Sequence, residues 1–155
     1  MNGRKHLLIV YHTQTGNTLK LAEAARRGAA QFADEVEVRF LTAFQAGLDD
    51  LLWCHGLLLG TPENFGCLSG GMKDFLDRTY YPAQGKVEGL PYAMFVSAGN
   101  DGTGAVAAME RIARGYALKK IHEPVIARQA VSPAHLAACE ELGQALAGGL
   151  AFGVF

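Results

Sequence analysis

Short apolar runs alternate with amphipathic segments of helical period along the whole 155-residue chain. The apolar runs have the composition of strands buried in a parallel sheet and lie at residues 6–11, 36–40, 56–60, 92–98 and 125–131. Between them, apolar residues recur at helical spacing over residues 17–32, 72–79, 106–116 and 133–146. This alternation predicts an α/β fold in which helices cover both faces of a parallel sheet.

Five strand-like runs favour a five-stranded parallel sheet in the order 2-1-3-4-5, within a three-layer α/β sandwich, over the six-stranded dinucleotide-binding order. The run at 36–40 alternates with charged residues, which places it nearer a sheet edge. No linker or repeat interrupts the pattern, so we expect residues 1–155 to form a single domain. Ligands of such sheets bind beyond the carboxyl ends of the strands, where the strand order reverses. The loops after the first, third and fourth strands therefore form the candidate site.

The first of these loops has the composition of a phosphate-binding loop. It gathers three threonine hydroxyls and successive backbone N–H groups at a helix N-terminus, where the macrodipole favours an anion. Gly16 allows the backbone to bend close to a phosphate, and the absence of Lys and Arg leaves neutral donors to hold it. The expected contacts are Thr13, Gln14, Thr15, Gly16, Asn17 and Thr18.

This loop resembles the Thr/Ser-x-Thr-Gly-x-Thr signature with which flavodoxins bind the phosphate of FMN, and Thr13, Thr15, Gly16 and Thr18 match it position by position. The segment 60–78 is similar to the Gly-[Ser/Thr]-Pro-x-x-[Phe/Tyr]-Gly loop and the following helix of NAD(P)H-dependent FMN and quinone reductases. Similar segments occur in the tryptophan repressor-binding protein group, whose additional insertion this chain has no room for. The resemblance covers residues 7–104 and fades beyond residue 116.

The resemblance implies a flavodoxin-like fold, FMN as a non-covalent cofactor and NAD(P)H as the electron donor. It places the second loop against the isoalloxazine, where Phe65 offers a flat ring, through Pro62, Glu63, Asn64, Phe65 and Gly66. It places the third loop on the pyrimidine side, through Ser97, Ala98, Gly99, Asn100, Asp101 and Gly104. Because the flavin carries the chemistry, no side chain is assigned a catalytic role, and the roles of His12 and Cys67 stay open.

Two function classes fit this site. The first is an oxidoreductase that passes electrons from NAD(P)H to a quinone or a similar small acceptor, and the second is a flavodoxin-type electron carrier between protein partners. The third loop has no Tyr or Trp, so the sequence lacks the two-aromatic sandwich that shields the flavin of electron-carrier flavodoxins. An open flavin face and a net charge of only -1 favour the oxidoreductase.

Composition and motifs exclude several other classes. The 14 Lys and Arg against 15 Asp and Glu leave no basic surplus for nucleic acid. No apolar run approaches the ~20 residues of a membrane span, and no signal-peptide pattern is present, so we expect a cytoplasmic protein without membrane insertion. The three cysteines show no metal-binding spacing and predict reduced thiols.

Three enzyme and signalling classes lack their defining residues in this chain. A response regulator needs clustered acids and a phosphorylatable Asp after the first and third strands, and a P-loop nucleotidase needs Gly-Lys-[Ser/Thr]; neither is present. The Cys-x5-Arg of a thiol phosphatase is also missing, since the residue at that spacing from Cys67 is Lys73, which cannot grip phosphate in the planar two-donor manner of Arg. The apolar tail 150–155 suits either closure of the core or an interface in a homo-oligomer.

Overall fold

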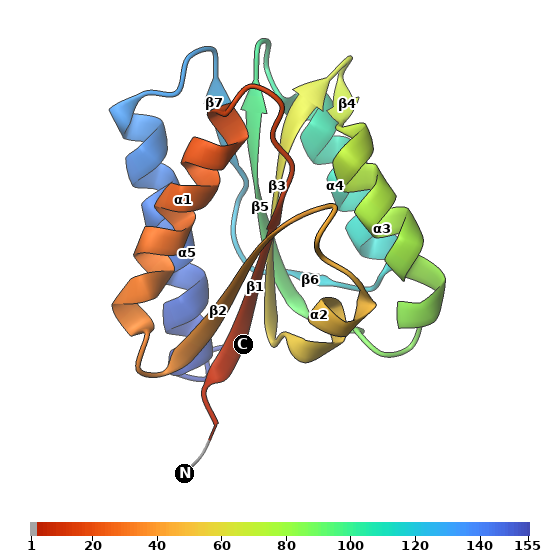
Figure 1. The fold of residues 1–155 in the computed structure, drawn as a ribbon, viewed down its shortest axis with the longest axis vertical. Helices are drawn as coiled ribbons and strands as arrows, with labels where there is room; N and C mark the ends of the chain where they lie inside the picture. Colours follow the sequence, from red (N-terminus) through yellow and green to blue (C-terminus); the bar gives the residue numbers. More distant parts are fainter. Residues whose placement is uncertain (1–2) are drawn as a thin grey trace.

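The computed structural model describes residues 3–155 and confirms the predicted alternation of strands and helices (Figure 1). The elements in chain order are β1 (Lys5–Tyr11), α1 (Asn17–Ala29), η1 (Ala30–Phe32), β2 (Val36–Thr42), α2 (Leu48–Trp53), β3 (Gly56–Asn64), β4 (Cys67–Leu68), α3 (Gly70–Ala83), β5 (Pro91–Ala98), α4 (Thr103–Gly115), β6 (Lys119–Lys120), β7 (Val125–Arg128) and α5 (Pro133–Ala151). The short helix α2 and the two-residue strands β4 and β6 were not predicted from the sequence.

The main sheet is parallel and has the order β2-β1-β3-β5, which confirms the predicted arrangement of the first four strands. The predicted fifth strand corresponds to β7, which pairs with the end of β5, whereas the unpredicted strand β6 precedes it and pairs with the start of β5. Pro124, which has no N–H to donate, lies between β6 and β7, directly before the start of β7. The predicted end at residue 131 was wrong: β7 ends at Arg128 because Gln129 adopts a left-handed conformation with φ 63°.

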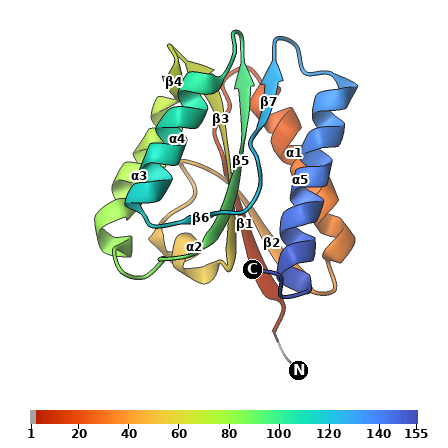
Figure 2. The ribbon, with the colours of Figure 1, turned by 180° about the vertical axis from the view of Figure 1, so that it is seen from behind.

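Helices cover both faces of this sheet, as predicted. Figure 1 and Figure 2 show α1 and α5 side by side on one face, with α3 and α4 on the other and α2 near the amino ends of the strands. Each face has its own cluster of buried apolar side chains. The carboxyl ends of β1, β3 and β5 therefore meet at one edge of the sheet, which is uppermost in Figure 1.

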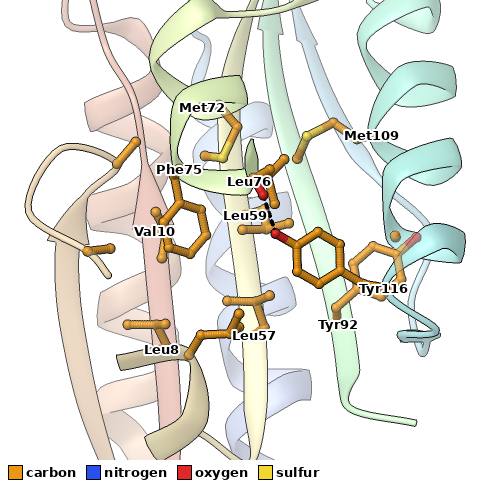
Figure 3. Close-up of a cluster of buried hydrophobic side chains, with 14 of the residues drawn as sticks. Leu8, Val10, Leu57, Leu59, Met72, Phe75, Leu76, Tyr92, Met109 and Tyr116 are labelled. Carbon is orange, nitrogen blue, oxygen red and sulfur yellow. Dashed lines mark hydrogen bonds between the residues drawn. The ribbon is translucent and has the colours of Figure 1, made fainter. Parts of the chain in front are cut away.

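The core under α3 is built around Phe75, whose side chain is completely buried (Figure 3). Tyr116, at the end of α4, joins this cluster and donates its phenolic proton to the carbonyl oxygen of Leu76. The hydroxyl of Thr79 lies 2.7 Å from the same phenolic oxygen. Burial raises the pKa of Tyr116, which therefore stays a neutral donor that ties α4 to α3.

The longest helix, α5, has 19 residues and begins with Ser132 as its N-cap and Pro133 in its first turn, as predicted. Its last turn and the residues after it form the apolar tail. Leu150 is buried and Phe155 packs against the core under α1 and α5, whereas Phe152 and Val154 are exposed. Neither α5 nor any other helix within residues 3–155 is long and apolar enough to cross a bilayer.

A histidine pair lies at the opposite end of β1 from the candidate site. The backbone N–H of His6 donates to Nδ1 of His55 over 2.9 Å, and the His6 ring stacks on Trp53 with the ring centroids 4.1 Å apart. Burial, followed by the positive charges of His6 and Lys5, lowers the pKa of His55. A proton on Nδ1 of His55 would also remove the acceptor of the His6 bond.

The free energy of unfolding is therefore expected to fall as the pH drops below about 6.5. In that range the unfolded chain binds a proton at His55 that the folded chain does not, so stability rises with pH. The pKa of His12, also lowered by burial, adds to the same trend. His55→Asn keeps an acceptor oxygen near the position of Nδ1 but cannot titrate, so it should flatten the dependence. Urea unfolding from pH 5 to 8 measures this, and an unchanged slope in the variant would contradict it.

Candidate cofactor site

A cleft of about 370 Å³ lies at the carboxyl ends of β1, β3 and β5, and its volume is in the usual range for small-molecule sites. All three predicted loops contribute to its lining, through Gln14, Thr15, Asn17, Thr18, Pro62, Glu63, Asn64, Ser97, Ala98 and Gly99. The topology brings these loops together although Gln14 and Gly99 lie 85 positions apart along the chain (99 − 14). The cleft is therefore where the strand order predicts a ligand site.

The remaining predicted residues lie in the same loops but do not line the cleft; they are Thr13, Gly16, Phe65, Gly66, Asn100, Asp101 and Gly104. Two of them hold their own loop in shape. The hydroxyl of Thr13 accepts the N–H of Gly16 over 3.1 Å, and Oδ1 of Asp101 accepts the N–H of Thr103 over 3.0 Å. The hydrogen bonds from Thr103 lower the pKa of Asp101, so this acid stays ionised as a local acceptor.

Two lining residues, Gln129 and Ala130, were not predicted from the sequence. They form the loop after β7, which reaches the same edge because β7 is parallel to β5. Gln129 donates its backbone N–H to Ala98 over 2.8 Å and its side-chain amide to the carbonyl of Gly99. The signal that could have found them is topological, since the predicted fifth strand runs parallel to the fourth and its following loop therefore reaches the same edge.

The first loop leaves the N-terminus of α1 open to a ligand. Gly16 is its N-cap in a left-handed conformation with φ 97°, no side chain caps the helix, and its first turn carries no acid. Thr15 is exposed, whereas the hydroxyl of buried Thr18 lies 2.8 Å from that of Ser97. No Lys or Arg of the described part of the chain lines the cleft, so backbone N–H groups and hydroxyls are its candidate anion-binding donors.

The second loop is a hairpin, referred to below as the β3–β4 hairpin (residues 63–68). Its turn residues Phe65 and Gly66 have φ of 52° and 72°, the positive values of the two-residue turns that suit hairpins. The Phe65 side chain has a relative exposure of 108%, so it does not pack on its own loop. The side-chain amide of Asn64 donates to Gln14 over 2.7 Å and links this hairpin to the first loop.

His12 and Cys67 lie outside the cleft lining. Nδ1 of His12 lies 2.6 Å from the hydroxyl of Ser69, which is the N-cap of α3 and accepts the N–H of Met72 over 3.2 Å. His12 therefore links the end of β1 to the start of α3. Cys67 is exposed on the β3–β4 hairpin, and all three cysteines are free.

A family model for the NADPH-dependent FMN reductases matches residues 33–131. The chain belongs to this FMN reductase family. The match contains the second and third loops of the cleft and extends through β7, whereas the first loop precedes it. The family match also extends beyond residue 116, whereas the motif resemblance described above becomes weak after that residue.

Curated relatives of this FMN reductase family member carry two kinds of name. A flavodoxin of Aquifex aeolicus is 38% identical over 98 residues, which are 63% of this chain and 52% of that protein. An NAD(P)H dehydrogenase (quinone) of Acidithiobacillus ferrooxidans is 32% identical over 111 residues, 59% of this chain and 56% of that protein. Another of the same name, from Archaeoglobus fulgidus, is 30% identical over 115 residues, 59% and 60% of the two chains. The chain thus spans little more than half the length of these relatives.

Solved structures confirm the flavodoxin-like fold. A flavodoxin from the domain Archaea superposes with a TM-score of 0.81 at 22% identity, over 94% of this chain and 98% of the other. A flavodoxin, WrbA-like protein from Agrobacterium tumefaciens superposes with a TM-score of 0.77 at 19% identity, over 96% and 98% of the two chains. At these identities the likeness concerns the fold alone.

Proposed function

We propose that this FMN reductase family member binds FMN non-covalently in the cleft and passes electrons from NAD(P)H to a quinone or a similar small acceptor. The observation that carries the proposal is the composition of the cleft. The residues after an uncapped helix N-terminus without acids line one part of the cleft, and residues of the β3–β4 hairpin line another; the fully exposed Phe65 ring lies next to them at the hairpin tip, outside the lining. The first suits a phosphate and the second suits a flat ring system.

The phosphate of FMN would bind at the first loop. The backbone N–H groups that open α1 and the hydroxyls of Thr15 and Thr18 are its donors, and the positive end of the helix macrodipole offsets its charge. Among residues 3–155, Glu63 is the only acid that lines the cleft, and its two oxygens accept the N–H groups of Gly102 and Ala105 at the start of α4. The cleft therefore holds no unpaired negative charge that would repel the phosphate.

The isoalloxazine would lie between the β3–β4 hairpin and the third loop. Pro62 and Asn64 line one wall, Ala98 and Gly99 line the other, and Phe65 is free to contact the ring from the hairpin tip. Small residues in the third loop leave one face of the ring open for a second flat molecule. When bound, FMN supplies hydride chemistry: NAD(P)H, one proton and a quinone become NAD(P)⁺ and a hydroquinone.

A second candidate function is a flavodoxin-type electron carrier. The 38% identity to a protein named flavodoxin favours it. The absence of an aromatic side chain in residues 97–104 argues against it, because those residues leave one wall of the cleft without a ring to shield the flavin.

Ping-pong kinetics with NAD(P)H and a quinone are expected from the FMN-loaded protein. Both substrates must stack on the same open face, at the ~3–3.5 Å that transfer requires, so the first product leaves before the second substrate binds. Initial rates of NADH and NADPH oxidation across a panel of quinones should give parallel double-reciprocal lines, and Phe65→Ala should lower them. Negligible oxidation with every acceptor would move the assignment to the electron carrier.

A further inference from the structure

The N-cap residue of α4 has no side chain to cap the helix, and Asp101 just before it accepts the N–H of Thr103, at the first helical position. This N-cap is Gly102, with φ 77°, and a Cβ there would lie 2.6 Å from Cγ2 of Ile126. Both facts require glycine, which has no side chain to accept the N–H of Ala105 at the third helical position. Ala105 in turn cannot accept the N–H of Gly102, as the Glu or Gln of a capping box does.

Glu63 supplies both missing acceptors from β3. Its Oε1 accepts the N–H of Gly102 over 3.2 Å, and its Oε2 accepts the N–H of Ala105 over 3.1 Å. The two donors lie 39 and 42 residues further along the chain. A single carboxylate thus takes the place of the two side chains of a capping box, and its negative charge lies at the positive end of the α4 macrodipole.

A backbone contact next to Glu63 joins the same two elements. A Cβ on Gly104 would lie 2.1 Å from the carbonyl oxygen of Gly66, so the tip of the β3–β4 hairpin touches the first turn of α4 directly. In that tip Phe65 holds φ 52°, a conformation unfavourable for a bulky residue, which the surrounding contacts must maintain. The hairpin and the start of α4 therefore behave as one docked unit.

We propose that Glu63 is a positioning residue that acts through the N–H groups of Gly102 and Ala105. Its carboxylate holds the loop 99–102 against the β3–β4 hairpin and so sets the spacing of the two walls between which the isoalloxazine binds. The inference rests on the proposed function, because it concerns the same cleft. It also differs from the role that the family resemblance implies for Glu63, since both of its oxygens accept backbone N–H groups at the start of α4.

This role separates ring binding from phosphate binding. The two hydrogen bonds of the Glu63 carboxylate go to Gly102 and Ala105 and not to the first loop. Loss of the carboxylate should therefore loosen the ring site and leave the phosphate site intact. FMN and riboflavin share the ring and differ in the phosphate. Loss of Glu63 should therefore weaken both ligands by the same factor.

The test compares Glu63→Ala and Glu63→Gln with Asp50→Asn. Asp50 is a matched control, since its carboxylate accepts the N–H of Gly47 over 2.9 Å at the start of α2 and pairs with Arg39 over 3.0 Å, outside the cleft. Dissociation constants of FMN and riboflavin come from quenching of flavin fluorescence. Hydrogen exchange of residues 99–105 and urea midpoints report on loop order and stability.

Glu63→Ala is expected to raise both dissociation constants by roughly tenfold to a hundredfold, with their ratio unchanged and exchange faster at 99–105. Glu63→Gln keeps one acceptor oxygen, so its flavin affinity should lie between those of the parent and Glu63→Ala. If the alanine variant does not fold, the glutamine variant is measured in its place. Asp50→Asn should lower the urea midpoint and leave both constants unchanged.

Three outcomes would overturn the inference while FMN binding stands. The first is unchanged flavin affinity in both Glu63 variants, and the second is a loss of flavin affinity in Asp50→Asn equal to that in Glu63→Ala. The third is weaker flavin binding in the Glu63 variants without faster hydrogen exchange at residues 99–105, because that result would indicate direct contact between Glu63 and the ring. A parent protein that binds no FMN would instead overturn the proposed function, and the inference with it.

Discussion

Replacing Thr15 and Thr18 together by valine is expected to weaken FMN binding by about 10²–10⁴-fold. Each change removes a hydroxyl that we propose as a donor to the charged phosphate while keeping the shape of the side chain, at a cost of about 1.5–3 kcal/mol. Both residues line the cleft, beside the open N-terminus of α1. Riboflavin carries no phosphate, so its binding should change little, and the preference for FMN should disappear. Parallel titrations with the two flavins measure this.

The control for this variant is Ser97→Ala. Thr18→Val also removes the buried hydrogen bond between the hydroxyls of Thr18 and Ser97, which are 2.8 Å apart. Ser97→Ala removes the same bond but keeps both threonines, so it should lower stability and retain the preference for FMN. If the double variant bound FMN as tightly as the parent, the phosphate would lie elsewhere. In the parent, FMN at a hundredfold excess over Kd should stabilise the fold by ~2.7 kcal/mol.

Phe75→Ala is expected to lower the free energy of unfolding by about 3–5 kcal/mol. The Phe75 ring is fully buried between the sheet and α3, so its loss leaves a cavity among packed side chains (Figure 3). Domains of this size are stable by only about 5–15 kcal/mol, so the variant should unfold at much lower urea. Urea unfolding of the apo protein at pH 7.5 or above, where His55 is neutral in both states, measures the difference.

The same substitution at Phe65 is the matched control. Its ring is fully exposed at the hairpin tip, so Phe65→Ala should change the free energy of unfolding by no more than about 0.5 kcal/mol. The same variant is expected to lower turnover of the FMN-loaded protein. Equal losses of stability in the two variants would mean that Phe65 packs against the protein in solution. Unchanged turnover would remove Phe65 from the proposed flavin contacts.

Local pattern was sufficient to predict the first four strands and their flanking helices. The run from His6 to Tyr11 is apolar at consecutive positions, which suits a strand buried on both faces, and the switch to helical period at Asn17 marks α1. The end of the fifth strand was not predictable in this way. The run 125–131 looks continuous, but Gln129 adopts a left-handed conformation and its loop turns into the cleft.

The sequence by itself determined the fold class and the three loops that line the cleft, because strand and helix periods are local properties and parallel strands end at a common edge. Only the tertiary structure decided how those loops are held. Glu63 and its partners Gly102 and Ala105 have no signal in common along the chain, and Phe65 could have packed inward as readily as it faces solvent. Hydrogen bonds between distant segments depend on how closely a hairpin approaches a helix, and that distance is a property of the packed molecule.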